Sequence, residues 1–141
     1  MQKYKFIEHT ADAKFQAYGR SMEEAFSNAA LAMFSIMTDP EKVERKKRLK
    51  ISAKGQDLKS LLVSFLEEFV FLLDSQNFLL NAVEKAQITK TEEGYEIGAD
   101  AVGDVEAGKY ETKGDVKAVT YNDMQINEEK GSCMVQVLVD I

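Results

Sequence analysis

The sequence predicts an α+β fold, a two-layer sandwich in which two helices cover one face of a mainly antiparallel sheet. Apolar residues recur at helical spacing in two long segments, and the second half of the chain consists of short β-branched and aromatic runs separated by turn residues. The predicted order is strand, helix, strand, helix and then four strands. With no repeat or linker in 141 residues, we expect a single domain spanning residues 1–141.

The first helix is expected to begin after Ser21. Ser21 and Glu24 have the spacing of a capping box, in which the serine hydroxyl accepts from the Glu24 amide and the glutamate accepts from the Ser21 amide. Pro40 follows the segment and predicts its end near Thr38 and Asp39. The expected core-facing residues are Met22, Ala25, Phe26, Ala29, Ala30, Met33, Phe34 and Met37.

The second helix is expected to follow Asp57, which can accept a hydrogen bond from the first turn. Gln76 and Asn77 predict its end. Its apolar face is wide, so the helix should be largely buried; this face comprises Leu58, Leu61, Leu62, Phe65, Leu66, Phe69, Leu72 and Leu73.

The expected strands share β-branched and aromatic residues and are bounded by turn residues. They lie at residues 3–7, 14–18, 49–54, 78–89, 95–102, 116–121 and 133–139. The last two should pair at the centre of the sheet. Residues 103–114 contain three glycines and are expected to form a long hairpin loop.

The composition is that of a soluble globular protein, with 45% hydrophobic and 30% charged residues. The chain lacks an apolar run of the roughly 20 residues that a membrane helix needs and has no signal peptide, so we expect a cytoplasmic protein. Cys133 is the only cysteine, which excludes an internal disulfide. The net charge of −6 argues against nucleic-acid binding through the whole surface but allows a local basic patch.

Asp140 and Ile141 bring a carboxylate, a backbone carbonyl and the terminal carboxylate together at the end of a predicted strand. Such a group of oxygens suits a hard cation if another carboxylate joins it. A strand that simply ends in solvent is the alternative, and the chemistry alone favours it because single carboxylates at strand ends are usually solvated.

His9 is the only histidine, and it lies in a polar turn three residues before Asp12. The sequence allows two interpretations of His9, a hydrogen-bonded structural residue and a catalytic residue. A serine or cysteine nucleophile would need His9 as its base, and the nucleotide-binding loops and paired-histidine metal motifs are absent. Catalysis by this chain alone is therefore not expected.

A basic cluster stands out in this acidic chain and consists of Arg45, Lys46, Lys47 and Arg48. One interpretation is a phosphate or RNA contact. The other is a solvated connector leading into an edge strand, and it is favoured because no aromatic residues that could stack on bases are interleaved.

Five motifs together resemble the archease family across nearly the whole chain. They are residues 9–12 (HTAD), 21–26 (SMEEAF), 37–39 (MTD), 116–121 (VKAVTY) and 139–141 (VDI). The resemblance implies a small single-domain activator of the RtcB-type tRNA-splicing ligase that promotes guanylylation and turnover of the ligase. Some archease-like proteins are instead linked to a tRNA cytosine methyltransferase as chaperone-like modulators.

The resemblance also implies a divalent-cation site, with calcium in crystals and magnesium or manganese as physiological alternatives. Carried over by position, Asp12, Asp140 and Ile141 would be its ligands, in agreement with the oxygen cluster above. The same motifs offer four partner or effector contacts, His9, Asp39, Lys117 and Tyr121.

Two positions depart from the family pattern. Asn122 stands where a histidine is common, and Ala13 where a larger aliphatic residue is common. The first departure puts any role of that histidine in doubt here, whereas the second concerns packing.

Three functions therefore compete at this point. The first is a non-catalytic activator of an RNA ligase. The second is an RNA-binding or methyltransferase-directed chaperone that uses the basic cluster. The third is a metal-dependent hydrolase in which Asp12 and Asp140 hold the ion and His9 is the general base, a thin set of groups for chemistry.

Overall fold

The computed structural model describes residues 1–8 and 12–141. The elements in chain order are β1 (Tyr4–Ile7), β2 (Ala13–Gly19), α1 (Met22–Ser35), the 3-10 turn η1 (Pro40–Lys42), β3 (Lys47–Gly55), α2 (Leu58–Gln76), β4 (Leu79–Thr91), β5 (Gly94–Asp104), the 3-10 turn η2 (Ala107–Lys109), β6 (Ala118–Glu129) and β7 (Ser132–Asp140). Both helices and all seven predicted strand segments are thus present. Their ends are shifted by a few residues, except that β6 continues to Glu129 where the prediction ended at Tyr121. The predicted order was one strand short, because two strands and not one precede α1.

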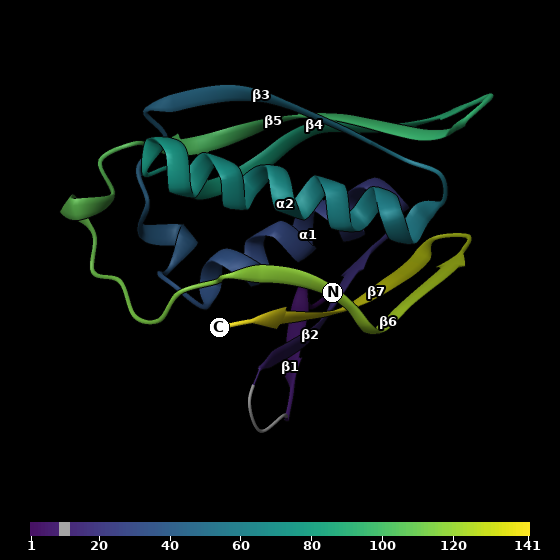
Figure 1. Cartoon of the computed structure of the whole chain (residues 1–141), viewed down its shortest axis with the longest axis horizontal. Coiled ribbons are helices and arrows are strands. Elements are labelled where there is room, and N and C mark those ends of the chain that lie inside the picture. Colours follow the sequence, from purple (N-terminus) through teal and green to yellow (C-terminus); the bar gives the residue numbers. More distant parts are fainter. Residues whose placement is uncertain (9–11) are drawn as a thin grey trace.

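The strands form two antiparallel sheets (Figure 1). A four-stranded sheet has the order β1-β2-β7-β6, and a three-stranded sheet has the order β3-β5-β4. The α+β class and the antiparallel pairing are confirmed. The layers differ from the prediction, however, because the two helices lie between two sheets instead of covering one face of a single sheet.

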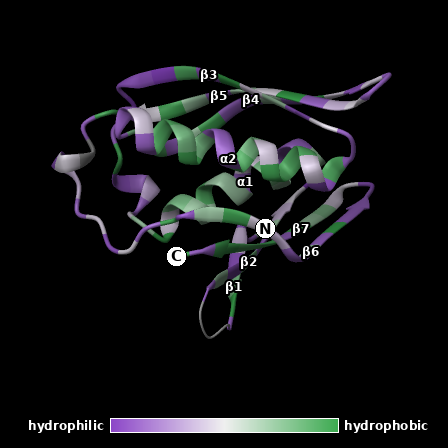
Figure 2. Ribbon diagram, in the orientation of Figure 1, coloured by the Kyte–Doolittle hydropathy of each residue, from purple (hydrophilic) through white to green (hydrophobic). Residues whose placement is uncertain are grey.

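The composition of the helices explains why they lie between the sheets. Each helix contacts strands of both sheets. α1 buries nine of its 14 residues, and α2 carries apolar residues from its first turn to its last, with polar residues between them (Figure 2). A helix with apolar residues on opposite sides needs cover on both, and a second sheet supplies it.

Aromatic rings join the two helices at the centre of the core. The ring centroid of Phe65 lies 6.1 Å from that of Phe26 on α1 and 5.1 Å from that of Phe69, and the second pair is T-shaped. All three side chains are fully buried. Such edge-to-face pairs add to the stabilisation from burial of their area.

The helix ends follow the predicted caps with one correction. The Ser21 hydroxyl accepts from the Glu24 amide at 3.1 Å, but the Glu24 carboxylate accepts from the Arg20 amide at 2.8 Å and not from Ser21. The reciprocal capping box occurs instead on α2, between Asp57 and Ser60.

The segment between β5 and β6 is not the predicted hairpin loop. β5 belongs to the three-stranded sheet and β6 to the four-stranded one, so residues 105–117 cross from one sheet to the other (Figure 1). The tight hairpin is at β6 and β7, which meet at Lys130 and Gly131. β7 lies inside its sheet as predicted, but β6 is an edge strand.

No helix in the described part of the chain is long and apolar enough to cross a membrane.

Candidate functional site

The two predicted metal-binding aspartates lie at the ends of neighbouring strands. Asp140 ends β7, and Asp12 directly precedes β2. Because Ala13 pairs with Val139, Asp12 and Asp140 are the next residues along the two antiparallel strands. Residues 120 or more positions apart in sequence are therefore brought to one end of the four-stranded sheet.

Lys117 reaches the same end from the other side of β7. Its backbone amide donates to the Asp140 carbonyl at 2.8 Å, and Ala118 is the register partner of Asp140. Asp140 and Lys117 are exposed, and Asp12 is half-buried. We name Asp12, Asp140 and Lys117 the strand-end cluster.

The oxygens of the strand-end cluster suit a hard cation in kind. Asp12 and Asp140 supply carboxylates, and Ile141 adds main-chain oxygen beside them. Hard divalent cations prefer such ligands and complete their shells with water. Within residues 1–8 and 12–141, no three or more His, Cys, Asp and Glu side chains are grouped to hold a metal ion, so the side chains contribute no more than the two carboxylates to this site.

The other predicted partner contacts are not all at this end. His9 lies outside the described residues. Asp39 is exposed and caps η1, since its carboxylate accepts from the Glu41 amide at 3.1 Å. Tyr121 is 56% exposed and belongs to β6.

A large bulge in β6 presents Tyr121. Thr120 pairs with Leu138 and Gln125 with Gln136, so four residues of β6 oppose one of β7. Asp123 in this bulge has a φ of 55°, a left-handed conformation that aspartate tolerates better than most residues. We name residues 121–124 the β6 bulge.

A polar network fastens the β6 bulge to the sheet. Tyr18 donates its hydroxyl to Gln16 at 2.8 Å, and the Gln16 amide donates to the Gln136 oxygen at 2.9 Å. The Gln136 amide then donates to the Asp123 carbonyl at 2.8 Å, while the Lys14 ammonium pairs with the Asp123 carboxylate at 2.9 Å. This glutamine network runs from β2 across β7 to β6.

Sequence reasoning missed the glutamine network. Gln136 is only 7% exposed, and an amide in the middle of an apolar strand signals a buried polar partner. That signal was available in the sequence, but the identity of the partner was not.

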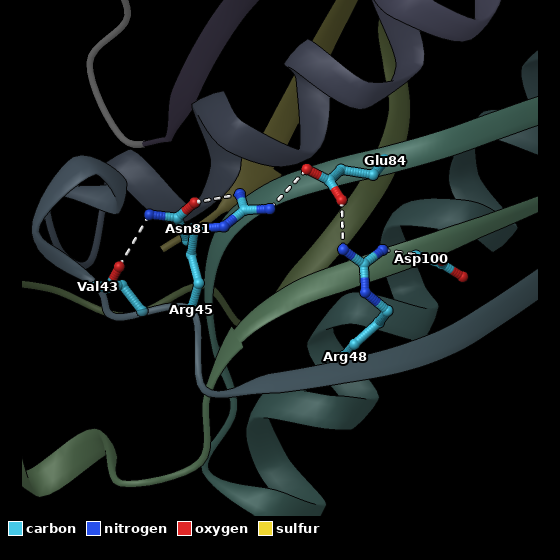
Figure 3. A network of polar contacts seen from close by, with 6 residues as sticks. All are labelled: Val43, Arg45, Arg48, Asn81, Glu84 and Asp100. Atoms are coloured by element: carbon cyan, nitrogen blue, oxygen red, sulfur yellow. Dashed lines mark hydrogen bonds and ion pairs between the residues drawn. The ribbon is translucent and has the colours of Figure 1, made fainter.

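The two arginines of the basic cluster are held in ion pairs (Figure 3). Arg45 pairs with Glu84 at 2.6 Å, and Arg48 bridges Glu84 and Asp100, the latter at 2.9 Å. These hydrogen bonds hold the pKa of Glu84 below its usual value. The bond from Arg45 has the largest effect, followed by the bond from Arg48.

The remaining members of the basic cluster are lysines. Lys46 lies 3.5 Å from Glu44, and Lys47 makes no ion pair within the part of the chain described. Much of the positive charge of this cluster is thus matched by carboxylates that the sequence places far away, on β4 and β5. RNA binding by the basic cluster stays a prediction. Its two arginines are engaged in ion pairs with Glu84 and Asp100, so they would have to exchange these partners to contact phosphates.

The comparison with protein families decides the relationship of this chain. Residues 4–141 match the model of the Archease protein family. The chain belongs to the archease family. It is 40% identical to the protein archease of Pyrococcus abyssi and 41% identical to that of Thermococcus kodakarensis, in each case over the whole of both chains.

A solved structure supports the fold of this archease-family chain. The solution structure of Methanobacterium thermoautotrophicum protein 1598 is similar with a TM-score of 0.78 and 36% sequence identity, and the match covers all of both chains. The archease of Methanosarcina mazei is 40% identical over 99% of this chain and 97% of its own.

Proposed function

We propose that this archease-family chain is a non-catalytic, cytoplasmic activator of an RtcB-type RNA ligase, which promotes guanylylation and multiple turnover of the ligase. The observation that carries the proposal is the full-length family match in a chain whose two strand-end aspartates converge from opposite ends of the sequence. A site with one exposed and one half-buried carboxylate at the end of a sheet is suited to engage the metal-dependent active site of another enzyme.

The strand-end cluster would act by holding a divalent cation, calcium, magnesium or manganese. Asp12, Asp140 and Ile141 would be the ligands, and the ion would supply charge that organises oxygens of the partner. Lys117 directly precedes β6, Tyr121 lies on β6, and both are exposed. Asp39, which caps η1, is exposed as well. In this proposal the three side chains contact the ligase. His9 belongs to the same proposed contact set.

A role as an activator fits the chemistry of the chain better than a role as a hydrolase. The chain has one histidine, and the only cysteine is 5% exposed with the pKa of its thiol raised by burial. A buried thiol with a raised pKa is a poor nucleophile, and a single histidine is a thin basis for catalysis, so the proposal assigns the chemistry to the partner.

The deciding experiment is transfer of labelled GTP to a cognate ligase, with and without substoichiometric amounts of this protein. We expect faster guanylylation and several ligation turnovers with the protein, and no joining of RNA ends by the protein alone. Asp12→Asn and Asp140→Asn should each abolish the stimulation. Asp74→Asn, at an exposed position on α2, removes the same charge elsewhere and should leave it intact.

Unchanged guanylylation and turnover would contradict the proposal. The chaperone-like action on a tRNA cytosine methyltransferase would then become the better hypothesis, and its assay is the rate and product specificity of that enzyme with and without this protein.

Cation binding can be measured without any ligase. Calorimetric titration with calcium, magnesium and manganese should show a site in the wild type and in Asp74→Asn. The Asp12→Asn variant should bind at least about tenfold more weakly, because it loses one of two side-chain carboxylates. Equal affinity in the wild type and in Asp12→Asn would rule out a shared site.

A further inference from the structure

The outward face of the three-stranded sheet carries a shallow hollow of about 940 Å³. Its floor is formed by the middle strand β5, and its sides by the edge strands β3 and β4. The three-stranded sheet that carries it lies on the opposite side of the helix layer from the four-stranded sheet (Figure 1). We name it the cationic hollow because four cationic and two acidic side chains line it; these are Arg48, Lys50, Lys54, Lys85, Glu96 and Asp100.

The acidic residues of the cationic hollow neutralise only part of its charge. Asp100 is 9% exposed and is held by Arg48 at 2.9 Å. Glu96 lies 3.4 Å from Lys54, whose side chain is 81% exposed. Lys50 and Lys85 make no ion pair among the described residues, so their charge is available on the surface of a chain with a net charge of −6.

The geometry of the strands spreads the lysines over the hollow. Lys50 and Lys54 are four residues apart on β3, which corresponds to roughly 13 Å, and β4 lies two strand spacings away, about 10 Å. Lys85 has a φ of 56° in a bulge of β4, where Lys85 and Ala86 together oppose the single residue Ala99 of β5. The three ammonium groups therefore surround the hollow and do not form a single point of charge.

The rest of the lining is mixed. Ile51, Ala53, Ile97 and Ala99 also line the hollow, but they are buried or half-buried, so polar side chains provide most of the groups that a ligand could hydrogen-bond. Gly98 lies at the centre, and a Cβ atom added there would meet no heavy atom within 4 Å. Ser52, Gln87 and Thr89 add hydroxyl and amide groups, and no aromatic side chain lines the hollow. Such groups are those that contact phosphates and sugars in nucleic-acid complexes.

We propose that the cationic hollow binds the sugar-phosphate backbone of single-stranded RNA without preference for sequence. Separated lysines fit a chain of phosphates, and hydroxyl and amide groups fit the 2′-hydroxyls. Because no aromatic ring lines the hollow, bases are not held by stacking, and the binding is limited to contacts with the backbone. An acidic protein segment fits less well, because protein interfaces rely on aromatic and large apolar anchors, whereas this face has no aromatic lining residue and its isoleucines, Ile51 and Ile97, are buried.

This proposal differs from RNA contact through the basic cluster. The arginines of that cluster are occupied by Glu84 and Asp100, whereas Lys50 and Lys85 are not so paired. It is also independent of the proposed activation of a ligase, since the strand-end cluster lies in the other sheet.

The test is fluorescence anisotropy of a labelled 20-nucleotide single-stranded RNA titrated with the full chain. Three phosphate contacts give a slope of log affinity against log salt of about −2, so affinity should fall roughly 20-fold between 50 and 200 mM salt. The hollow variant replaces Lys50, Lys54 and Lys85 by glutamine and should bind at least about tenfold more weakly at 50 mM salt, with a flatter slope.

A matched control replaces Lys5, Lys59 and Lys130 by glutamine. These residues are exposed and lie on β1, on α2 and in the β6-β7 turn, so the control has the same net charge as the hollow variant. It should retain the affinity and the salt slope of the wild type. Thermal unfolding by circular dichroism checks that both variants are folded.

Several results would overturn the proposal. They are no binding by the wild type at 50 mM salt, equal loss in the hollow variant and the control, equal affinity for DNA of the same sequence, or a polyglutamate peptide that binds through the three lysines when RNA does not. Because the assay contains no ligase, failure here leaves the activator proposal standing, and failure of the guanylylation assay leaves this one standing.

Discussion

Gln136→Leu should destabilise the protein and loosen the β6 bulge, because Gln136 is the centre of the glutamine network. The substitution keeps the size of the side chain but removes two hydrogen bonds, those with the Gln16 amide at 2.9 Å and with the Asp123 carbonyl at 2.8 Å. A net contribution of about 1 kcal/mol for each bond gives a loss of about 2 kcal/mol in the free energy of unfolding.

Urea unfolding followed by circular dichroism measures this loss. Gln87→Leu is the control, since Gln87 is exposed on β4, and it should change the free energy of unfolding by less than about 0.5 kcal/mol. In two-dimensional NMR spectra the Tyr121 amide should shift in Gln136→Leu and stay in place in Gln87→Leu.

A double-mutant cycle refines the prediction. Gln16→Leu combined with Gln136→Leu removes both partners of the Gln16–Gln136 hydrogen bond, so no buried amide group of this pair is left without its partner. The loss in free energy of unfolding of the double variant should therefore be smaller than the sum of the losses of the two single variants. Strict additivity, or a loss below about 0.5 kcal/mol in Gln136→Leu, would refute the view that this network holds the β6 bulge.

Two further predictions concern the core and the arginine pairs. Phe65→Ala should lower the free energy of unfolding by about 3–5 kcal/mol through cavity formation, while Phe71→Ala on the same helix, where the side chain is 62% exposed, should cost far less; similar urea midpoints would contradict this. Glu84→Gln should destabilise the protein at pH 7, and because the pKa of Glu84 is lowered on folding by Arg45 and Arg48, the difference from the wild type should be complete above about pH 4.3 and shrink as the pH falls below it. Urea unfolding at pH 7, 5 and 3.5 checks the second prediction, and a difference that does not change with pH would be evidence against it.

Local patterns were sufficient to predict the helices and most strand segments. Ser21, Asp57 and Asn77 are found at the helix ends because caps depend on neighbours within a few residues. The apolar alternation of β3 likewise reports which of its residues face the core, whereas β7 is buried on both faces from Val135 to Val139.

The layer arrangement could not be predicted in the same way. Alternation along a strand indicates that one face is buried, but not which strand lies beside it, so two sheets and one sheet give similar patterns. The stronger indication was α2, whose apolar residues are too numerous for cover by one sheet.

The candidate sites likewise divide into those predicted from local sequence and those that depend on distant partners. Asp12 and Asp140 were named from sequence because each stands at a strand end within a recognisable motif, and the register of β2 and β7 does bring those strand ends together. Glu84 and Asp100 were missed as partners of the arginines because they lie 36 to 52 positions away in the chain. The β6 bulge was missed since its polar residues resemble an ordinary loop.

The two sheets also differ in when they can form as the chain folds. All strands of the three-stranded sheet lie within residues 47–104, whereas the four-stranded sheet needs β2 to meet β7, with Gln16 and Gln136 separated by 120 positions. Closing a longer loop costs more chain entropy, and non-local pairing slows folding. We therefore expect the three-stranded sheet and α2 to form before the four-stranded sheet, and the strand-end cluster to be assembled only when β7 joins β2.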